Sequence, residues 1–303
     1  MAQVDRPKTV FPSAREDAGA AAEVEGTPQT RSPSYRLAYA DTEFLLREEL
    51  RAVRLQLELM KPELIQQEQG VVSTVVIFGS TRIPDPAAAL TQLEAAHAAA
   101  LARPEDPGLA RGAAIAERLA DKSRYYEEAR RLAQIVTQVS QVNGHREFVV
   151  VTGGGPGIME AANRGANEVG GKSIGLSIVL PHEQHPNPYI APELSFQFHY
   201  FAVRKMHFLL RAKALVAFPG GYGTLDELFE TLTLIQTRKV KPVPVVLFGR
   251  DYWERIIRFQ ALVDEGTIGP GDLDHFQYAE TAEEAWGLIR DFYGIDGVSV
   301  EES

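Results

Sequence analysis

The stretch that decides the fold is residues 214–230, which read ALVAFPGGYGTLDELFE. An apolar run leads into a turn with three glycines in four positions, PGGYGT at 219–224, and then into a helical segment. Apolar strands without polar alternation are typical of parallel sheets that are covered on both faces. The stretch therefore predicts a buried strand, a glycine-rich turn and a helix.

The order of apolar strand followed by helix repeats on both sides of this stretch. Apolar runs at 72–78, 148–151, 173–179 and 244–248 are separated by segments with helical character. Strands that alternate with helices form a parallel, doubly wound sheet. We expect an α/β, Rossmann-like fold with a mostly parallel sheet of about seven strands flanked by helices. Ligands of such sheets bind beyond the carboxyl ends of the strands.

Composition divides the chain into a core domain and its extensions. Residues 1–34 are rich in proline and poor in large apolar groups, which predicts a disordered leader. Residues 35–70 are expected to form an N-terminal helical extension, and residues 71–295 the Rossmann-like domain. Within that domain, residues 84–121 are rich in alanine, proline and charge and predict a helical insertion. Residues 296–303 form a tail.

The overall composition excludes several classes of function. The chain has 303 residues, no cysteine, 31 Lys and Arg and 41 Asp and Glu, for a formal charge of −10. Disulfides, thiol nucleophiles and cysteine-ligated metals are excluded, and a reducing, cytoplasmic location is expected. No apolar run approaches the about 18 residues of a membrane span. The acidic charge disfavours nucleic acid, whose phosphates are contacted by Lys and Arg.

The glycine turn at 219–224 has the context of an anion site. Glycines let backbone amides approach an anion, and a helix N-terminus adds about half a positive charge. The alternative is a capping box, in which Thr224 and Glu227 stabilise the helix start without any ligand. A capping box does not explain the three glycines. The spacing therefore favours an anion-binding turn, but both interpretations remain open. Acids at Asp226, Glu227 and Glu230 would repel phosphate, so one of them is expected to face an oxocarbenium-like sugar.

A pair of basic residues, Arg204-Lys205, precedes this turn and can supply positive charge or form a solvated helix face. The pair followed by PGGYGTLDE at 219–227 resembles the signature of the Lonely Guy (LOG) family, an Arg-Lys pair followed by PGGxGTxxE. GGGPGIM at 153–159 resembles the other glycine turn of that family, and GSTR at 79–82 its first-strand loop. The resemblance covers about residues 72–293.

The resemblance implies a phosphoribohydrolase, in a family formerly labelled lysine decarboxylases. Such enzymes split the N-glycosidic bond of adenosine-type 5′-monophosphates, releasing free base and ribose 5-phosphate. Residues 71–295 would then be the nucleotide-binding catalytic domain, with Arg204 and Glu227 as the catalytic pair and with no metal or organic cofactor. The implied substrate-binding residues are Gly79, Ser80, Gly154, Gly155, Glu183, Lys205, Gly220, Gly221, Tyr222, Gly223, Thr224, Asp226 and Thr233.

The chain also departs from the short form of the family. That form has a Met-His dipeptide before its Arg-Lys pair, whereas residues 200–203 read YFAV here. The leader and the insertion are similar to the longer bacterial form, for which AMP is the expected substrate and cytokinin nucleotides are possible ones. The resemblance implies a homodimer or a higher homo-oligomer, with no nucleic acid or membrane partner. Two alternatives stay open: a non-catalytic nucleotide sensor or carrier, and a pyridoxal-phosphate decarboxylase with Lys205 as its Schiff base.

Overall fold

The computed structural model describes residues 10–142, 144–181 and 185–295. Two compact units divide the chain, one ending at Glu58 and the other beginning at Leu59. The first unit holds α1 (Ala14–Ala22), α2 (Thr42–Leu45), the short 3-10 helices Pro33–Tyr35, Ala38–Ala40 and Glu48–Leu50, and the start of α3 (Arg51–Glu68).

Helix α1 lies inside the stretch for which composition predicts disorder. A capping box between Ser13 and Glu16 starts the helix, and its alanine-rich sequence favours helical backbone. None of its residues is buried, so local capping and propensity account for it without a core. The disorder of residues 1–34 remains a prediction, and residues 1–9 and the tail at 296–303 lie outside the described residues.

The second unit contains a seven-stranded sheet in which every pair of neighbouring strands is parallel. The strands are β1 (Thr74–Phe78), β2 (Val149–Thr152), β3 (Ile174–Ile178), β4 (Ser195–Phe198), β5 (Ala212–Ala217), β6 (Val245–Phe248) and β7 (Gln277–Ala279). Their order is β4-β3-β2-β1-β5-β6-β7. The predicted doubly wound α/β fold is confirmed.

The order of the strands reverses between β1 and β5. From β1 the chain adds β2, β3 and β4 on one side, and then crosses back to place β5, β6 and β7 on the other. Ligands of doubly wound sheets bind at such a switch point, in the crevice beyond the carboxyl ends of the two strands. The loop after β1 and the glycine turn after β5 therefore lie where a ligand is expected.

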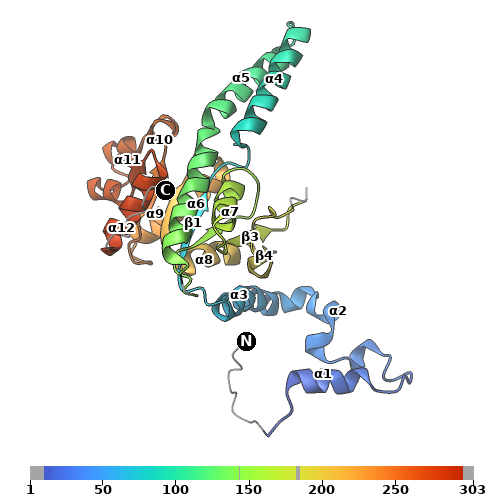
Figure 1. Cartoon of the computed structure of the whole chain (residues 1–303). Coiled ribbons are helices and arrows are strands. Elements are labelled where there is room, and N and C mark those ends of the chain that lie inside the picture. Colours follow the sequence, from blue (N-terminus) through green and yellow to red (C-terminus); the bar gives the residue numbers. More distant parts are fainter. Residues whose placement is uncertain (1–9, 143, 182–184, 296–303) are drawn as a thin grey trace. The chain divides into compact units, whose positions relative to one another are not determined.

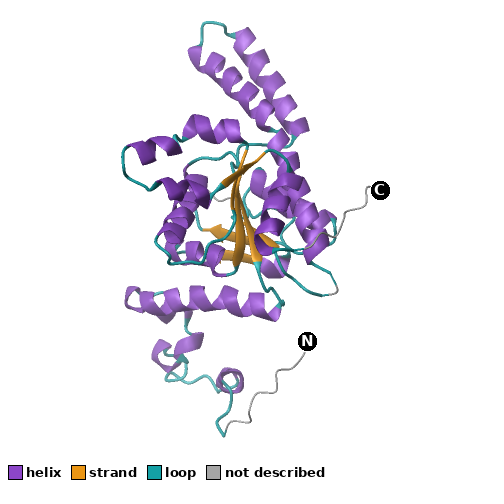
Figure 2. Ribbon diagram, turned by 90° about the vertical axis from the view of Figure 1, so that its left-hand side faces the viewer, coloured by secondary structure: helices purple, strands orange, loops and turns teal. Residues whose placement is uncertain are grey.

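Helices cover both faces of this sheet (Figures 1 and 2). Helices α6 (Arg124–Ser140), α7 (Ile158–Glu168) and α12 (Ala282–Tyr293) share a buried apolar cluster with inward residues of β1, β2, β5 and β6. On the other face, α8 (Phe201–Leu210) packs through Phe208, whose ring lies 4.7 Å from that of Phe78. Helix α9 (Tyr222–Gln236) follows β5, and α10 (Arg250–Ile256) and α11 (Phe259–Asp264) follow β6.

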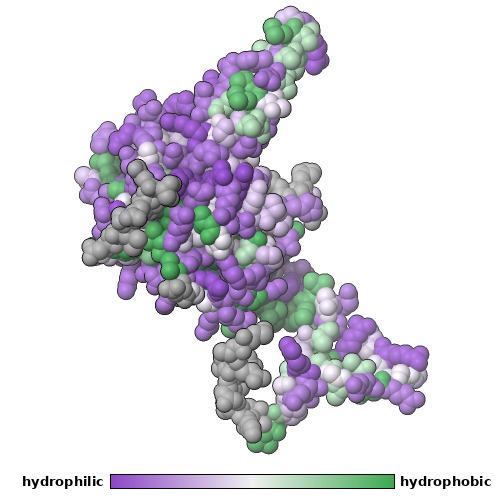
Figure 3. Space-filling model, in the orientation of Figure 1, coloured by the Kyte–Doolittle hydropathy of each residue, from purple (hydrophilic) through white to green (hydrophobic). Residues whose placement is uncertain are grey.

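The expected insertion contains two helices, α4 (Pro86–Ala102) and α5 (Pro107–Lys122), which form a hairpin (Figure 1). Asp85 and Asp106 cap them, each followed by a proline at the first helical position. Ala89 and Ala113 are their only buried residues, and apolar side chains mix with polar ones on the hairpin surface (Figure 3). Among the described residues, no helix combines the length and apolarity that crossing a bilayer requires.

Candidate active site

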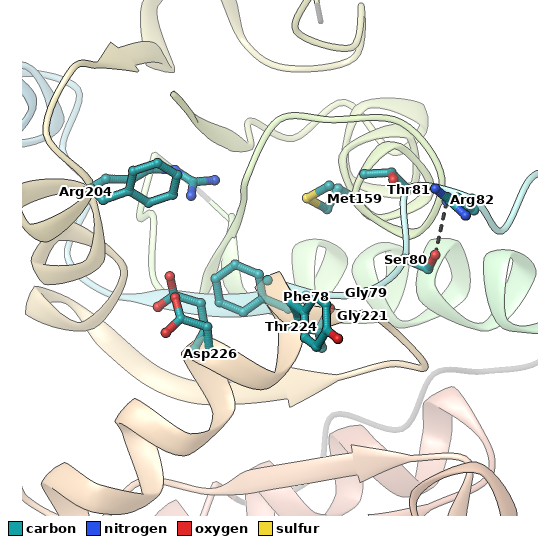
Figure 4. Close-up of a pocket in the computed structure, with 14 residues that line it drawn as sticks. Phe78, Gly79, Ser80, Thr81, Arg82, Met159, Arg204, Gly221, Thr224 and Asp226 are labelled. Atoms are coloured by element: carbon teal, nitrogen blue, oxygen red, sulfur yellow. Dashed lines mark hydrogen bonds between the residues drawn. The ribbon is translucent and has the colours of Figure 1, made fainter. Parts of the chain in front are cut away.

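A cavity of 510 Å³ opens at the switch point, beyond the carboxyl ends of β1 and β5 (Figure 4). The loop after β1, the start of α7, the start of α8 and the start of α9 surround it. Its lining residues are Phe78, Gly79, Ser80, Thr81, Arg82, Met159, Phe201, Arg204, Gly221, Tyr222, Gly223, Thr224, Asp226 and Glu227. Four of the segments singled out in the sequence thus meet in one place.

Backbone contacts fix these segments to one another. The Ser80 N–H donates to the Pro219 carbonyl at 2.9 Å, and the Ile158 N–H donates to the Ser80 carbonyl at 3.2 Å. Gly157 has a φ of 71°, and a Cβ there would lie 2.4 Å from the Ser80 carbonyl oxygen. Only glycine allows this approach, so the turn after β2 braces the loop after β1.

Helix α9 begins at Tyr222, with Gly221 as its N-cap and no side chain capping it. Thr224 and Glu227 both lie inside the helix, so the capping-box interpretation is wrong. Thr224 instead packs against Gly220, where a Cβ would lie 2.1 Å from the Thr224 hydroxyl oxygen. The first helical hydrogen bond runs from the Leu225 N–H to the Gly221 carbonyl, which leaves the earlier N–H groups at the cavity wall. This arrangement can bind an anion.

Glu227 is a buried carboxyl group at the wall of the same cavity. Its residue is 4% exposed, and it lies one helical turn beyond the glycine turn. Burial raises the pKa of Glu227 from 4.5 to about 7, with Lys205 opposing the rise and Glu230 adding to it. A carboxyl group with a pKa near neutrality can accept a proton from water and can also stabilise a developing positive charge.

Lys205 is held by three carboxylates rather than facing the cavity. Its Nζ lies 2.5 Å from Glu230, 2.9 Å from Asp226 and 3.7 Å from Glu227. Burial disfavours its charged form, but the hydrogen bonds to Glu230 and Asp226 outweigh that effect and raise the pKa of Lys205. Because Schiff-base lysines need a lowered pKa, this environment argues against the pyridoxal-phosphate alternative.

Arg204 reaches the cavity from α8 and lies across it from the loop after β1 (Figure 4). Its Nε donates to the Leu176 carbonyl at 2.7 Å, and its guanidinium lies 5.0 Å from the centre of the Phe208 ring. Burial lowers the pKa of Arg204, and the charges of Glu227 and Asp226 oppose that shift. The guanidinium therefore lies at the acidic side of the cavity.

Comparison with known proteins finds related sequences for this chain. A family profile described as "Possible lysine decarboxylase" matches residues 159–289. The cytokinin riboside 5′-monophosphate phosphoribohydrolase LOG3 of Arabidopsis thaliana is 30% identical over 152 residues, which are 48% of this chain and 69% of that protein. The chain belongs to the LOG family.

Other similarities of this LOG chain are more limited. The probable cytokinin riboside 5′-monophosphate phosphoribohydrolase LOGL5 of Oryza sativa subsp. japonica is 33% identical over 141 residues, 44% of this chain and 54% of that protein. The chain thus spans about half the length of this curated relative. The solved structure of TM1055, a structural genomics target, is 22% identical with a TM-score of 0.44, covering 72% of this chain and 99% of that one.

The structure brings nine of the site residues implied by the LOG resemblance to the cavity wall. They are Gly79, Ser80, Arg204, Gly221, Tyr222, Gly223, Thr224, Asp226 and Glu227. Lys205 and Thr233 line a neighbouring groove along α9, which shares Tyr222 and Asp226 with the cavity. Gly220 does not line the cavity, and its carbonyl accepts a hydrogen bond from the Tyr252 hydroxyl at 2.5 Å. Glu183 lies outside the described residues.

Gly154 and Gly155 are also absent from the cavity wall of this LOG chain. Asn187 is buried and its Nδ2 donates to both of their carbonyls at 3.2 Å and to the Asn163 Oδ1 at 2.9 Å. Asn163 in turn accepts from the Thr152 hydroxyl at 2.7 Å. A buried polar network of this kind fixes the turn after β2, so these two glycines shape the site without lining it.

Five residues that line the cavity of this LOG chain have no binding role predicted from the sequence. They are Phe78, Thr81, Arg82, Met159 and Phe201. Four of them directly adjoin or belong to a motif quoted from the sequence, and the position of that motif at a strand end was the available signal. Phe201 starts α8, and only the packing of α8 on the sheet brings it to the cavity. Among the described residues, no group of three or more His, Asp or Glu is placed to hold a metal.

Proposed function

We propose that this protein hydrolyses the N-glycosidic bond of a purine nucleoside 5′-monophosphate of the AMP type, releasing free base and ribose 5-phosphate. One observation carries the proposal. A buried carboxyl group with a pKa of about 7, Glu227, shares a cavity with an uncapped, glycine-rich helix N-terminus. The curated relatives, which are named as phosphoribohydrolases, support the reaction class.

The α9 N-terminus would hold the 5′-phosphate. The N–H groups of residues 222–224 precede the first helical hydrogen bond, and the Thr224 hydroxyl lies in the same turn. Backbone N–H groups and the helix dipole together favour an anion at this position. Because Glu227 follows one turn later on the cavity wall, the ribose of a bound nucleotide would face its carboxylate.

Glu227 would act on the anomeric carbon. As the bond from C1′ to the base nitrogen breaks, positive charge develops on the sugar, and the Glu227 carboxylate stabilises it. The carboxylate then accepts a proton from the attacking water, whose oxygen bonds to C1′. The departing base takes a proton from solvent, and Glu227 returns its proton to solvent, so that one water is added across the broken bond. Arg204 favours the ionised form of Glu227 through its charge. One water is consumed for each base released.

Base release from a panel of nucleotides tests the proposal. AMP, adenosine, ATP and an N6-modified AMP are incubated with the protein, and the free base is measured by chromatography. Glu227→Gln should slow release about 10²–10³-fold, while the matched control Glu254→Gln, at an exposed carboxylate paired with Arg250, should not. Nucleotide binding with no release by the wild-type protein would contradict hydrolysis and support the carrier alternative.

We also propose a homodimer, or a higher homo-oligomer, that associates through α8 and α9. Large apolar side chains are exposed on these helices next to the cavity: Phe201, Met206, Leu210, Tyr222 and Phe229. Tyr222 is 92% exposed although it belongs to both the cavity and the neighbouring groove. Exposed apolar clusters of this kind mark association surfaces. Light scattering of wild-type protein and of Met206→Glu tests this, since the charge should shift the protein toward monomer.

A further inference from the structure

The positive side chains around the cavity differ in how many carboxylates and carbonyls of the protein already surround them. Lys205 is surrounded by Asp226, Glu227 and Glu230. Arg204 donates to the Leu176 carbonyl and is attracted by Glu227 and Asp226. Neither charge is therefore available in full to a phosphate dianion. The remaining lining cation is Arg82, on the opposite side of the cavity (Figure 4).

Arg82 is exposed, and within the described ranges it forms no ion pair of 4.0 Å or less. Two acids, Asp85 and Glu160, border a second cavity of 460 Å³ that Arg82 also lines. Asp85 accepts hydrogen bonds from the N–H groups of residues 87 and 88 as the cap of α4. Glu160 accepts one from the Tyr126 hydroxyl at 3.0 Å. In the described part of the chain, neither carboxylate lies within ion-pair distance of the Arg82 guanidinium, so the guanidinium can accept a ligand.

The backbone holds Arg82 at a fixed place beside the glycine turn. Its N–H donates to the Ser80 hydroxyl at 3.1 Å, and the Ser80 N–H donates to the Pro219 carbonyl at 2.9 Å. The next residue, Ile83, is 1% exposed and anchors the loop in the core. A long, flexible side chain mounted on a fixed backbone can reach a ligand without moving the loop.

We propose that Arg82 binds the 5′-phosphate together with the N–H groups of α9, and thereby selects phosphorylated over unphosphorylated nucleosides. The inference rests on the proposed function of the site. A guanidinium offers paired donors that fit phosphate oxygens, and hydrogen bonds between charged groups are the stronger ones. The sequence pair Arg204-Lys205 would then serve the sugar and the acidic cluster rather than the phosphate.

Substitution of Arg82 tests the assignment. Arg82→Gln should lower kcat/KM for AMP about 10- to 100-fold and leave that for adenosine unchanged, because only AMP carries the phosphate. Arg82→Lys, which keeps the charge, should fall between wild type and Arg82→Gln. The matched control is Arg103→Gln, at an exposed arginine next to the turn between α4 and α5, which should change neither substrate. Thermal melts of all variants should coincide, since Arg82 is exposed.

Calorimetry with ribose 5-phosphate separates this inference from the proposed hydrolysis. If wild-type protein binds ribose 5-phosphate and Arg82→Gln binds it at least 10-fold more weakly, the inference holds even if no base is ever released. Equal affinity in the two proteins overturns it, whatever the turnover. A variant that loses AMP and adenosine activity equally also overturns it, because the side chain would then act on the sugar or base. No binding by wild-type protein would overturn it as well.

Discussion

Glu227→Gln is expected to stabilise the fold above pH 7 while it removes activity. The pKa of Glu227 rises from 4.5 to about 7 on folding because burial penalises the carboxylate. Between these values the folded protein binds more protons than the unfolded chain. The free energy of unfolding of the wild-type protein therefore falls as the pH rises through this window. The amide introduced by the substitution does not titrate, so the variant escapes this loss.

The structure sets the size of the effect. A rise from 4.5 to about 7 spans two to three pKa units, each worth about 1.36 kcal/mol, so the buried charge costs roughly 3 kcal/mol above pH 7. For a domain of about 150–250 residues, 1 kcal/mol shifts Tm by about 2–4 °C. The variant should therefore melt roughly 6–12 °C above wild type at pH 8. Near pH 4.5 the protonated carboxyl and the amide are nearly equivalent, and the two Tm values should converge.

The assay is thermal melting by circular dichroism at pH 5, 6, 7, 8 and 9. Wild type, Glu227→Gln and the exposed control Glu254→Gln are compared, and the same samples are assayed for AMP hydrolysis. The Tm difference should grow up to about pH 7 and then level off, while turnover of the variant falls about 10²–10³-fold. A Tm difference that is independent of pH, or a variant less stable than wild type at pH 8, would refute the reasoning. Lys205 and Arg204 would then outweigh the burial of the charge.

Three further predictions concern the same site. For wild-type protein, kcat/KM for AMP should rise about tenfold per pH unit below 7 and level above it, because the carboxylate is the active form; a decline above pH 7 in a pH–rate profile would contradict this. Gly220→Ala should weaken ribose 5-phosphate binding about tenfold in calorimetry, since its Cβ would lie 2.1 Å from Thr224, whereas Gly221→Ala, with open space at that position, should not. Lys205→Met should move the midpoint of the pH–rate profile upward, because Lys205 lowers the pKa of Glu227; an unchanged midpoint would argue against that coupling.

The sheet was predictable because its strands are buried on both faces. Val75, Val76 and Ile77 are 0% exposed, and such a strand must be apolar throughout, which the sequence displays directly. The glycine-rich turn after β5 was predictable because three glycines in four positions at the end of an apolar run are typical of a tight turn, and at Gly220 a Cβ would lie 2.1 Å from the Thr224 hydroxyl oxygen.

The start of α9 was not predictable from spacing. A threonine followed three residues later by glutamate fits a capping box, and it fits the interior of a helix equally well. The structure places the cap at Gly221, and this moves Glu227 from the end of the helix to a buried position on the cavity wall. The burial of a carboxyl group depends on all the elements that pack around it. A local sequence pattern therefore cannot predict it.

The proposed role of Arg82 and the contacts of Gly154 could not be predicted from the sequence, because both depend on tertiary contacts. Whether an arginine is paired depends on acids from other elements, here Asp85 and Glu160, whose own partners appear only in the fold. Gly154 is held by Asn187, which follows it by more than thirty residues. The motif GSTR at 79–82 nevertheless lies in a loop that lines the cavity, because it stands at the end of the central strand β1.

The pairing of β1 with β5 makes formation of the site depend on a long-range contact. Val75 pairs with Ala214, so the two halves of the crevice come from segments widely separated along the chain. Contacts between distant segments form slowly, because the entropy of closing a long loop is lost before the contacts contribute favourable free energy. During synthesis, a chain that has not passed α9 has neither the anion cradle nor Glu227. We therefore expect a bound nucleotide to slow amide hydrogen exchange in β1 and β5 together, as a single cooperative unit.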